Sequence, residues 1–128
     1  MKDLVEISNE LNFSEKSGGD WGIINTNPNR VQEFVEYLKI NTMSVSDKHE
    51  FLSLIISSFN EAILENKSSL ELTQKVVELI KENLNEELYL IEYFYWASLD
   101  QEEFPVSQII DTVLTDEGIH NIPGYFNP

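Results

Sequence analysis

The chain has 128 residues, of which 41% are hydrophobic and 11% aromatic, and these proportions favour a folded protein with a real core over a disordered acidic segment. Its 23 acidic and 8 basic residues give a formal net charge of −15, which argues against non-specific binding to nucleic acid and against an anionic membrane surface. The same charge favours fast, salt-sensitive capture of a basic partner.

The chain contains no cysteine, so disulfides, thiol catalysis and thiolate metal sites are excluded. The N-terminal segment has no apolar core of the signal-peptide kind, and no run approaches the roughly 20 apolar residues that a membrane helix needs. We therefore expect a cytoplasmic protein with no membrane contact. At this length we also expect a single helical domain over residues 1–128.

The first segment of the chain is predicted to be a short amphipathic helix over residues 3–16, because apolar residues recur at helical spacing from Leu4 onward. A Ser-Gly-Gly-Asp run then breaks the helix. Next comes either a short extended piece or a loop, which we expect to place Trp21 and Ile23 in the core.

Two longer helices follow. Asn27 is a good N-cap and Pro28 suits a first helical position, so a helix is predicted over residues 28–40. Ser44, with an acidic residue three positions later, resembles a capping box, and the broad apolar face behind it predicts a helix over residues 46–65.

The next helix is predicted over residues 69–84, with a capping box formed by Ser68 and Glu71. A short turn should place it antiparallel to a helix over residues 86–99, which is almost wholly apolar or aromatic and should be buried on most sides. The alternative for residues 86–99 is a strand, since Tyr, Phe and Trp favour sheets, but the run is long for a strand and no partner strand is evident.

The C-terminal part begins with an acidic loop at residues 100–103. Pro105 then enters a helix that runs to about Asp116 and ends at Gly118. The tail, residues 119–128, contains three helix breakers but is apolar enough to be docked. About six helices result, so the predicted fold class is all-α, either a helical bundle or a short stack of αα-hairpins.

The sequence offers no convincing catalytic or metal site. Glu117 and His120 have the spacing of a helical ligand pair, but Gly118 lies between them and no second pair exists. Carboxylate pairs are inevitable among so many acids, and the Ser-Gly-Gly-Asp run lacks the remaining features of a phosphate loop. We therefore predict no cofactor, no metal and no enzymatic activity.

The aromatic residues of the 86–99 segment suggest a binding role in addition to a core role. On a helix, Tyr89, Tyr93 and Trp96 share one face, and Tyr and Trp are enriched at interface hot spots. No Lys or Arg follows Lys81, while residues 82–128 carry ten acids. An aromatic anchor within an acidic rim is the partner-binding site that we predict, formed by Glu92, Tyr93, Trp96, Asp100, Glu102 and Glu103.

Small, cysteine-free, acidic, all-α chains recur among the immunity proteins of bacterial toxin–immunity systems, including contact-dependent inhibition. The chain resembles them in Asp20–Asn25 leading into Pro28–Val31, and in Tyr95–Leu99 followed by Glu102–Ser107. The resemblance implies a protein that binds one cognate toxin domain, often a nuclease with a basic cleft, and occludes it without catalysis. An acidic regulatory or structural binding domain, or less favoured a small carboxylate-dependent enzyme, remains the alternative.

Overall fold

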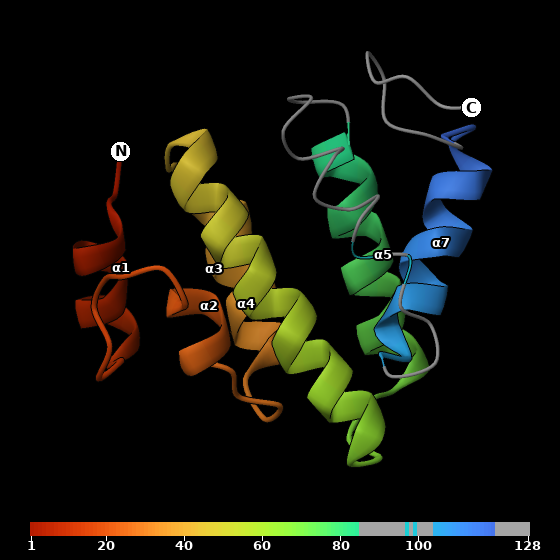
Figure 1. Ribbon diagram of the computed structural model, residues 1–128, viewed down its shortest axis with the longest axis horizontal. Coiled ribbons are helices and arrows are strands. Elements are labelled where there is room, and N and C mark those ends of the chain that lie inside the picture. The colour runs from red at the N-terminus through yellow and green to blue at the C-terminus, as the bar shows by residue number, and fades with distance from the viewer. Residues whose placement is uncertain (85–96, 98, 100–103, 120–128) are drawn as a thin grey trace. The chain divides into compact units, whose positions relative to one another are not determined.

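A computed structural model describes residues 1–84, 97, 99 and 104–119. Within this part of the chain the structure is all-helical, with six helices and no strand, which confirms the predicted all-α fold class (Figure 1). The chain divides into two compact units, Met1–Ser68 and Ser69–Pro128, and each is described by itself. The single domain and the bundle or hairpin arrangement stay predictions.

Helix α1 spans Leu4–Leu11 and is shorter than predicted. The Asp3 carboxylate caps its first turn by accepting the backbone N–H of Glu6 at 2.9 Å. The helix ends because Asn12 adopts a left-handed conformation, with φ of 61°. Asn tolerates this conformation better than most residues, so Asn12 ends the helix well before the predicted glycine breaker.

Helix α2, Trp21–Ile24, is a single helical turn where the sequence suggested an extended piece or a loop. Trp21 is fully buried as expected, but the prediction for Ile23 is wrong, since its side chain is 63% exposed. Residues two positions apart on a helix point in nearly opposite directions, so burying Trp21 turns Ile23 outward.

Helix α3 spans Val31–Ile40 and begins three residues later than predicted. Asn27 forms a turn instead of a helix cap: its side-chain oxygen accepts the N–H of Asn29 at 3.0 Å. The N–H of Asn27 donates to the hydroxyl of Ser58, also at 3.0 Å, so a distant residue fixes this turn.

Helix α4, Val45–Leu64, matches the predicted boundaries closely. The predicted cap is confirmed, because the Ser44 hydroxyl accepts the N–H of Asp47 at 3.1 Å. Asn66, with φ of 58°, ends the helix in the same left-handed conformation as Asn12.

In the first unit, α4 packs against α2 and α3 (Figure 1). The core of this unit is a cluster of aromatic rings. Successive ring centroids lie 5.4 to 6.3 Å apart, within the range of favourable aromatic pairs. The cluster consists of Phe13, Trp21, Phe34, Tyr37 and Phe51.

The second unit contains α5, Leu70–Leu84, and α7, Val106–Asp116, which pack against each other through aliphatic side chains. The cap of α5 is Ser69 and not the predicted Ser68, since the Ser69 hydroxyl accepts the N–H of Leu72 at 3.1 Å. Two adjacent serines made the capping pattern ambiguous.

Helix α7 ends at Gly118 as predicted. Gly118 has φ of 75°, its N–H donates to the carbonyl of Thr115, and the N–H of Ile119 donates to the carbonyl of Leu114. These two bonds form a Schellman motif, in which glycine is favoured. None of the helices in the described part of the chain is both long and apolar enough to cross a membrane.

Candidate functional site

The six predicted partner-binding residues lie outside the residues that the structure describes: Glu92, Tyr93, Trp96, Asp100, Glu102 and Glu103. The role assigned to them therefore stays a prediction. The nearest described apolar side chains on either side of residues 100–103 are exposed, Leu99 at 54% and Phe104 at 46%. Three of the four residues from 100 to 103 are acidic, so an acidic run lies between two exposed apolar side chains.

The acidic excess of the chain is concentrated in the second unit. Residues 69–128 contain twelve acidic and two basic residues, a formal net charge of −10, whereas residues 1–68 contain eleven and six, a charge of −5. One of the two basic residues, Lys75, lies 3.5 Å from the Glu71 carboxylate. On α7, Asp111 and Asp116 are exposed, and the helix carries no basic residue.

A groove of about 350 Å³ lies between α5 and α7. Its apolar lining comes from Val77, Ile109 and Val113, and Asp116 contributes a carboxylate. Three uncharged polar residues complete it, Thr73, Gln108 and Thr112. Such a lining suits an apolar side chain with a cationic group beside it.

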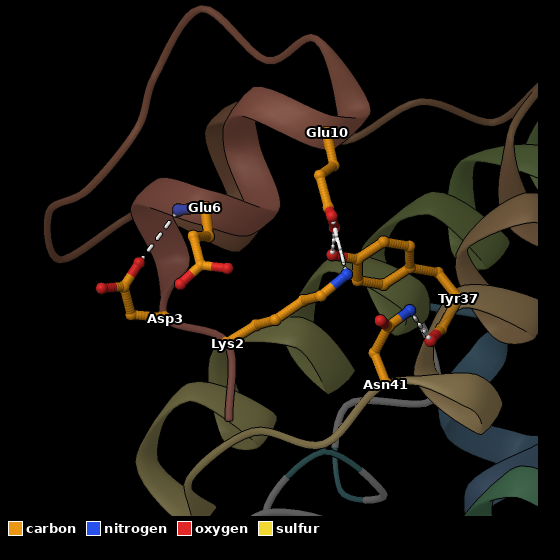
Figure 2. Close-up of polar contacts among 6 residues, drawn as sticks. All are labelled: Lys2, Asp3, Glu6, Glu10, Tyr37 and Asn41. Atoms are coloured by element: carbon orange, nitrogen blue, oxygen red, sulfur yellow. Dashed lines mark hydrogen bonds and ion pairs between the residues drawn. The ribbon is translucent and has the colours of Figure 1, made fainter.

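The first unit carries a polar cluster that joins its N-terminal residues to α1 and α3 (Figure 2). The Lys2 ammonium lies 2.5 and 2.7 Å from the two carboxylate oxygens of Glu10. The Tyr37 hydroxyl donates to the same carboxylate at 2.8 Å, and the Lys2 nitrogen lies 5.5 Å from the centroid of the Tyr37 ring. The cluster thus combines an ion pair, a hydrogen bond and a cation–π contact.

The electrostatics of this cluster shift two titrations. The hydrogen bonds from Lys2 and Tyr37 hold the pKa of the Glu10 carboxyl below its ordinary value of 4.5. Burial, followed by the hydrogen bond to Glu10, raises the pKa of the Tyr37 hydroxyl. Both directions favour a carboxylate that accepts a hydrogen bond from a protonated phenol, and the 2.8 Å contact between the two oxygens fits this arrangement.

Arg30 has a structural role at the edge of the aromatic cluster. Its guanidinium lies 5.3 and 5.1 Å from the ring centroids of Phe13 and Phe34. It also donates to both carboxylate oxygens of Glu33, at 2.7 and 2.8 Å, and to the carbonyl of Leu11. This cation stabilises the fold, because its hydrogen bonds and ring contacts all lie within the first unit.

Polar groups inside the first unit are also satisfied by one another. The Trp21 indole N–H donates to the Ser8 hydroxyl at 2.8 Å, and that hydroxyl donates to the carbonyl of Leu4 at 2.6 Å. Among the described residues, no buried side-chain nitrogen or oxygen lacks a partner. These buried groups therefore have a structural explanation.

Among the described residues, no three His, Asp or Glu side chains lie together in a way that could hold a metal ion. His120, which the sequence paired with Glu117, lies outside them. His49 lies 3.9 Å from Glu50, its neighbour on α4.

Sequence reasoning missed the Lys2, Glu10 and Tyr37 cluster. Glu10 lies eight residues from Lys2 and 27 residues from Tyr37, and no periodicity relates the three. One weak signal exists: Tyr37 follows Phe34 by three residues, which places it beside the apolar face of α3.

Comparison with models of protein families, with curated proteins and with solved structures finds no match to this chain.

Proposed function

We propose that the protein is a cytoplasmic inhibitor of the immunity type, which binds a cognate toxin domain with a basic, nuclease-type active-site cleft and neutralises it by occlusion. The observation that carries the proposal is the charge distribution, with a net charge of −10 in residues 69–128. The protein acts by binding, and its carboxylates take the place of nucleic-acid phosphates against the Lys and Arg side chains of the toxin.

The charge of the second unit supports rapid capture. Surfaces of one charge sign attract a partner of the opposite sign over several ångströms and raise the association rate well above that of neutral proteins. Salt screens this attraction, so the association rate should fall steeply with ionic strength.

Exposed apolar groups can slow dissociation of the complex, which charge attraction alone does not do. Leu99 and Phe104 flank residues 100–103, and aromatic residues such as Phe are enriched in the cores of protein interfaces, which a polar rim surrounds. The groove between α5 and α7 offers a second apolar surface, with Asp116 available for a cation. Both features support a slow dissociation rate in addition to a fast association rate.

The test is coexpression with the protein encoded immediately upstream, which is where the toxin of such a system is expected. We expect protection of the host cell and a stable complex, with an association rate that falls by at least tenfold between about 50 and 500 mM salt. If coexpression gives neither protection nor a complex, the proposal is wrong.

Two matched triple variants test which acidic residues speed up association with the toxin. Asp100→Asn/Glu102→Gln/Glu103→Gln should slow association with the toxin. The control removes the same three charges from the first unit, in Asp20→Asn/Glu36→Gln/Glu61→Gln, and should slow association less. Equal effects would mean that net charge matters and the predicted site does not.

A further inference from the structure

We propose that Glu10 and Tyr37 form a binding site for a lysine side chain of the partner, and that Lys2 occupies this site while the partner is absent. The inference rests on the proposed function, because a basic partner must supply the lysine. Lys2 then acts as an internal competitor.

The site already holds an ammonium group in a favourable geometry. The Lys2 nitrogen contacts both carboxylate oxygens of Glu10 and lies over the ring of Tyr37 at 5.5 Å (Figure 2). A carboxylate next to an aromatic face is the combination that recognises ammonium ions, since both groups attract positive charge. The geometry of Lys2 therefore shows that these two groups can accommodate an ammonium group.

The receiving groups are held in place independently of Lys2. The Tyr37 ring stacks on the buried Phe51 ring at a centroid distance of 5.4 Å and an interplanar angle of 18°. The Tyr37 hydroxyl fixes the Glu10 carboxylate at 2.8 Å, and both residues belong to helices. Removal of the Lys2 ammonium would leave a preorganised carboxylate and ring.

The local charge is not neutralised by Lys2. Figure 2 shows the carboxylates of Asp3 and Glu6 on the same short segment of chain as Lys2 and Glu10. Asp3 caps the N–H of Glu6, and the charge of Glu6 acts on the Tyr37 hydroxyl. Lys2, Asp3, Glu6 and Glu10 thus carry three negative charges and one positive charge, an excess that attracts a second cation.

Lys2 is also easy to displace. The two side chains of the Lys2–Glu10 pair are 32% and 40% exposed, and exposed ion pairs contribute little to stability. The backbone N–H of Lys2 donates to the carbonyl of Thr42 at 2.9 Å, so the chain can stay attached while the side chain leaves. A partner lysine that brings further contacts would replace it.

The first experiment uses the full-length protein and an acetylated, amidated tetralysine peptide, followed by NMR of the Tyr37 ring protons. Lys2→Met should bind the peptide roughly two- to fivefold more tightly than the wild type, because the competing ion pair is gone. The Tyr37 resonances should shift on binding. Equal affinities, or a Tyr37 signal that does not move at saturation, would overturn the proposal.

Double variants separate this site from general acidity. Lys2→Met/Glu10→Gln should lose the gain in peptide affinity. Lys2→Met/Glu36→Gln should keep it, because Glu36 lies on the same helix as Tyr37 but outside the cluster. If both double variants bind alike, the peptide senses only net charge and the site is not a lysine site.

The toxin complex distinguishes the two proposals. If the wild type binds no toxin, the proposed function fails, while the tetralysine titration still decides whether Glu10 and Tyr37 take an ammonium group. If the toxin binds but Lys2→Met and Lys2→Met/Glu10→Gln have the same affinity as the wild type, only the lysine site fails.

Discussion

The two units of the chain differ in how they use charge and packing. In the first unit, Lys2, Arg30 and Lys67 each lie in an ion pair, and the core is a cluster of aromatic rings. The described part of the second unit has aliphatic packing, an open groove and far more acidic than basic residues. The net charge that can attract a basic partner is therefore larger after residue 68, at −10, than before it, at −5.

We expect most of the stability to come from the aromatic cluster of the first unit, and most of the proposed partner binding to come from residues 99–104. Substitutions in the aromatic cluster should therefore change the free energy of unfolding. Substitutions near residues 99–104 should change affinity and leave unfolding nearly unaltered. The Lys2 cluster is the one place in the first unit where we expect both.

The largest effect is expected from Phe51→Ala. Phe51 is fully buried and its ring contacts those of Trp21, Phe34 and Tyr37, so its loss leaves a cavity at the centre of the cluster. We expect a loss of about 3–5 kcal/mol in the free energy of unfolding, measured by urea denaturation. Ile40→Ala is the control, because Ile40 is 83% exposed and should change stability little.

The second prediction concerns the close approach of α2 to α4. A Cβ atom on Gly22 would lie 2.8 Å from the carbonyl oxygen of Glu50 and 2.9 Å from the backbone nitrogen of Leu54. Gly22→Ala should therefore cost about 1–3 kcal/mol, despite the better helix propensity of alanine, because backbone atoms must move.

Gly19→Ala provides the matched control for this contact. Nothing lies within 4 Å of a Cβ atom at Gly19, and its φ is not in the left-handed region. Thermal unfolding should show a lower midpoint for Gly22→Ala only. Equal midpoints would contradict the tight α2–α4 packing.

The third prediction is that Phe104→Ala weakens binding of the proposed toxin partner. Phe104 is 46% exposed next to the acidic residues 100–103, and interface hot spots cost more than about 1 kcal/mol when truncated. We expect weaker toxin binding in calorimetric titration and an unfolding free energy within about 0.5 kcal/mol of the wild type. Leu64→Ala, at an exposed position on α4, should leave the affinity unchanged. The reverse result would move the binding surface to the first unit.

A smaller effect separates the two candidate caps of α5. Ser69→Ala removes the acceptor for the N–H of Leu72 and should cost about 1 kcal/mol, whereas Ser68→Ala should cost little. Chemical denaturation of both variants measures the difference. A larger cost for Ser68 would restore the cap that the sequence suggested.

The features that could be predicted from sequence are local ones. The Ser44 cap and the Gly118 end of α7 depend on residues a few positions apart, and both are confirmed. The late start of α3 could not be predicted, because Asn27 is held by Ser58, 31 residues away. Ile23 was misplaced for a related reason: burial of Trp21 fixed which way the turn faces.

The features of the candidate site also separate into local ones, which the sequence predicts, and tertiary ones, which it does not. The acidic excess after residue 81 can be counted in the sequence, and so can the aromatic density. The lysine site proposed at Glu10 and Tyr37 depends on a tertiary contact between residues 27 positions apart, which a single sequence does not predict. Local patterns thus predict a basic partner, whereas a site for a single side chain of that partner can be inferred only from packing.

The smallest effect is expected in the pKa of Glu10, which an NMR titration can measure directly. The pKa of Glu10 lies below its ordinary value of 4.5, mainly because of the hydrogen bond from Lys2, so this contact stabilises the fold above about pH 4.5. The contribution is lost as the pH falls through the lowered pKa. In Lys2→Met, NMR titration should show the Glu10 pKa moving back up. The pKa of Glu33, which Arg30 holds low, should stay unchanged. A Glu10 pKa indifferent to the substitution would mean that Lys2 does not occupy the carboxylate in solution, and the proposal that Lys2 competes for the lysine site would be wrong.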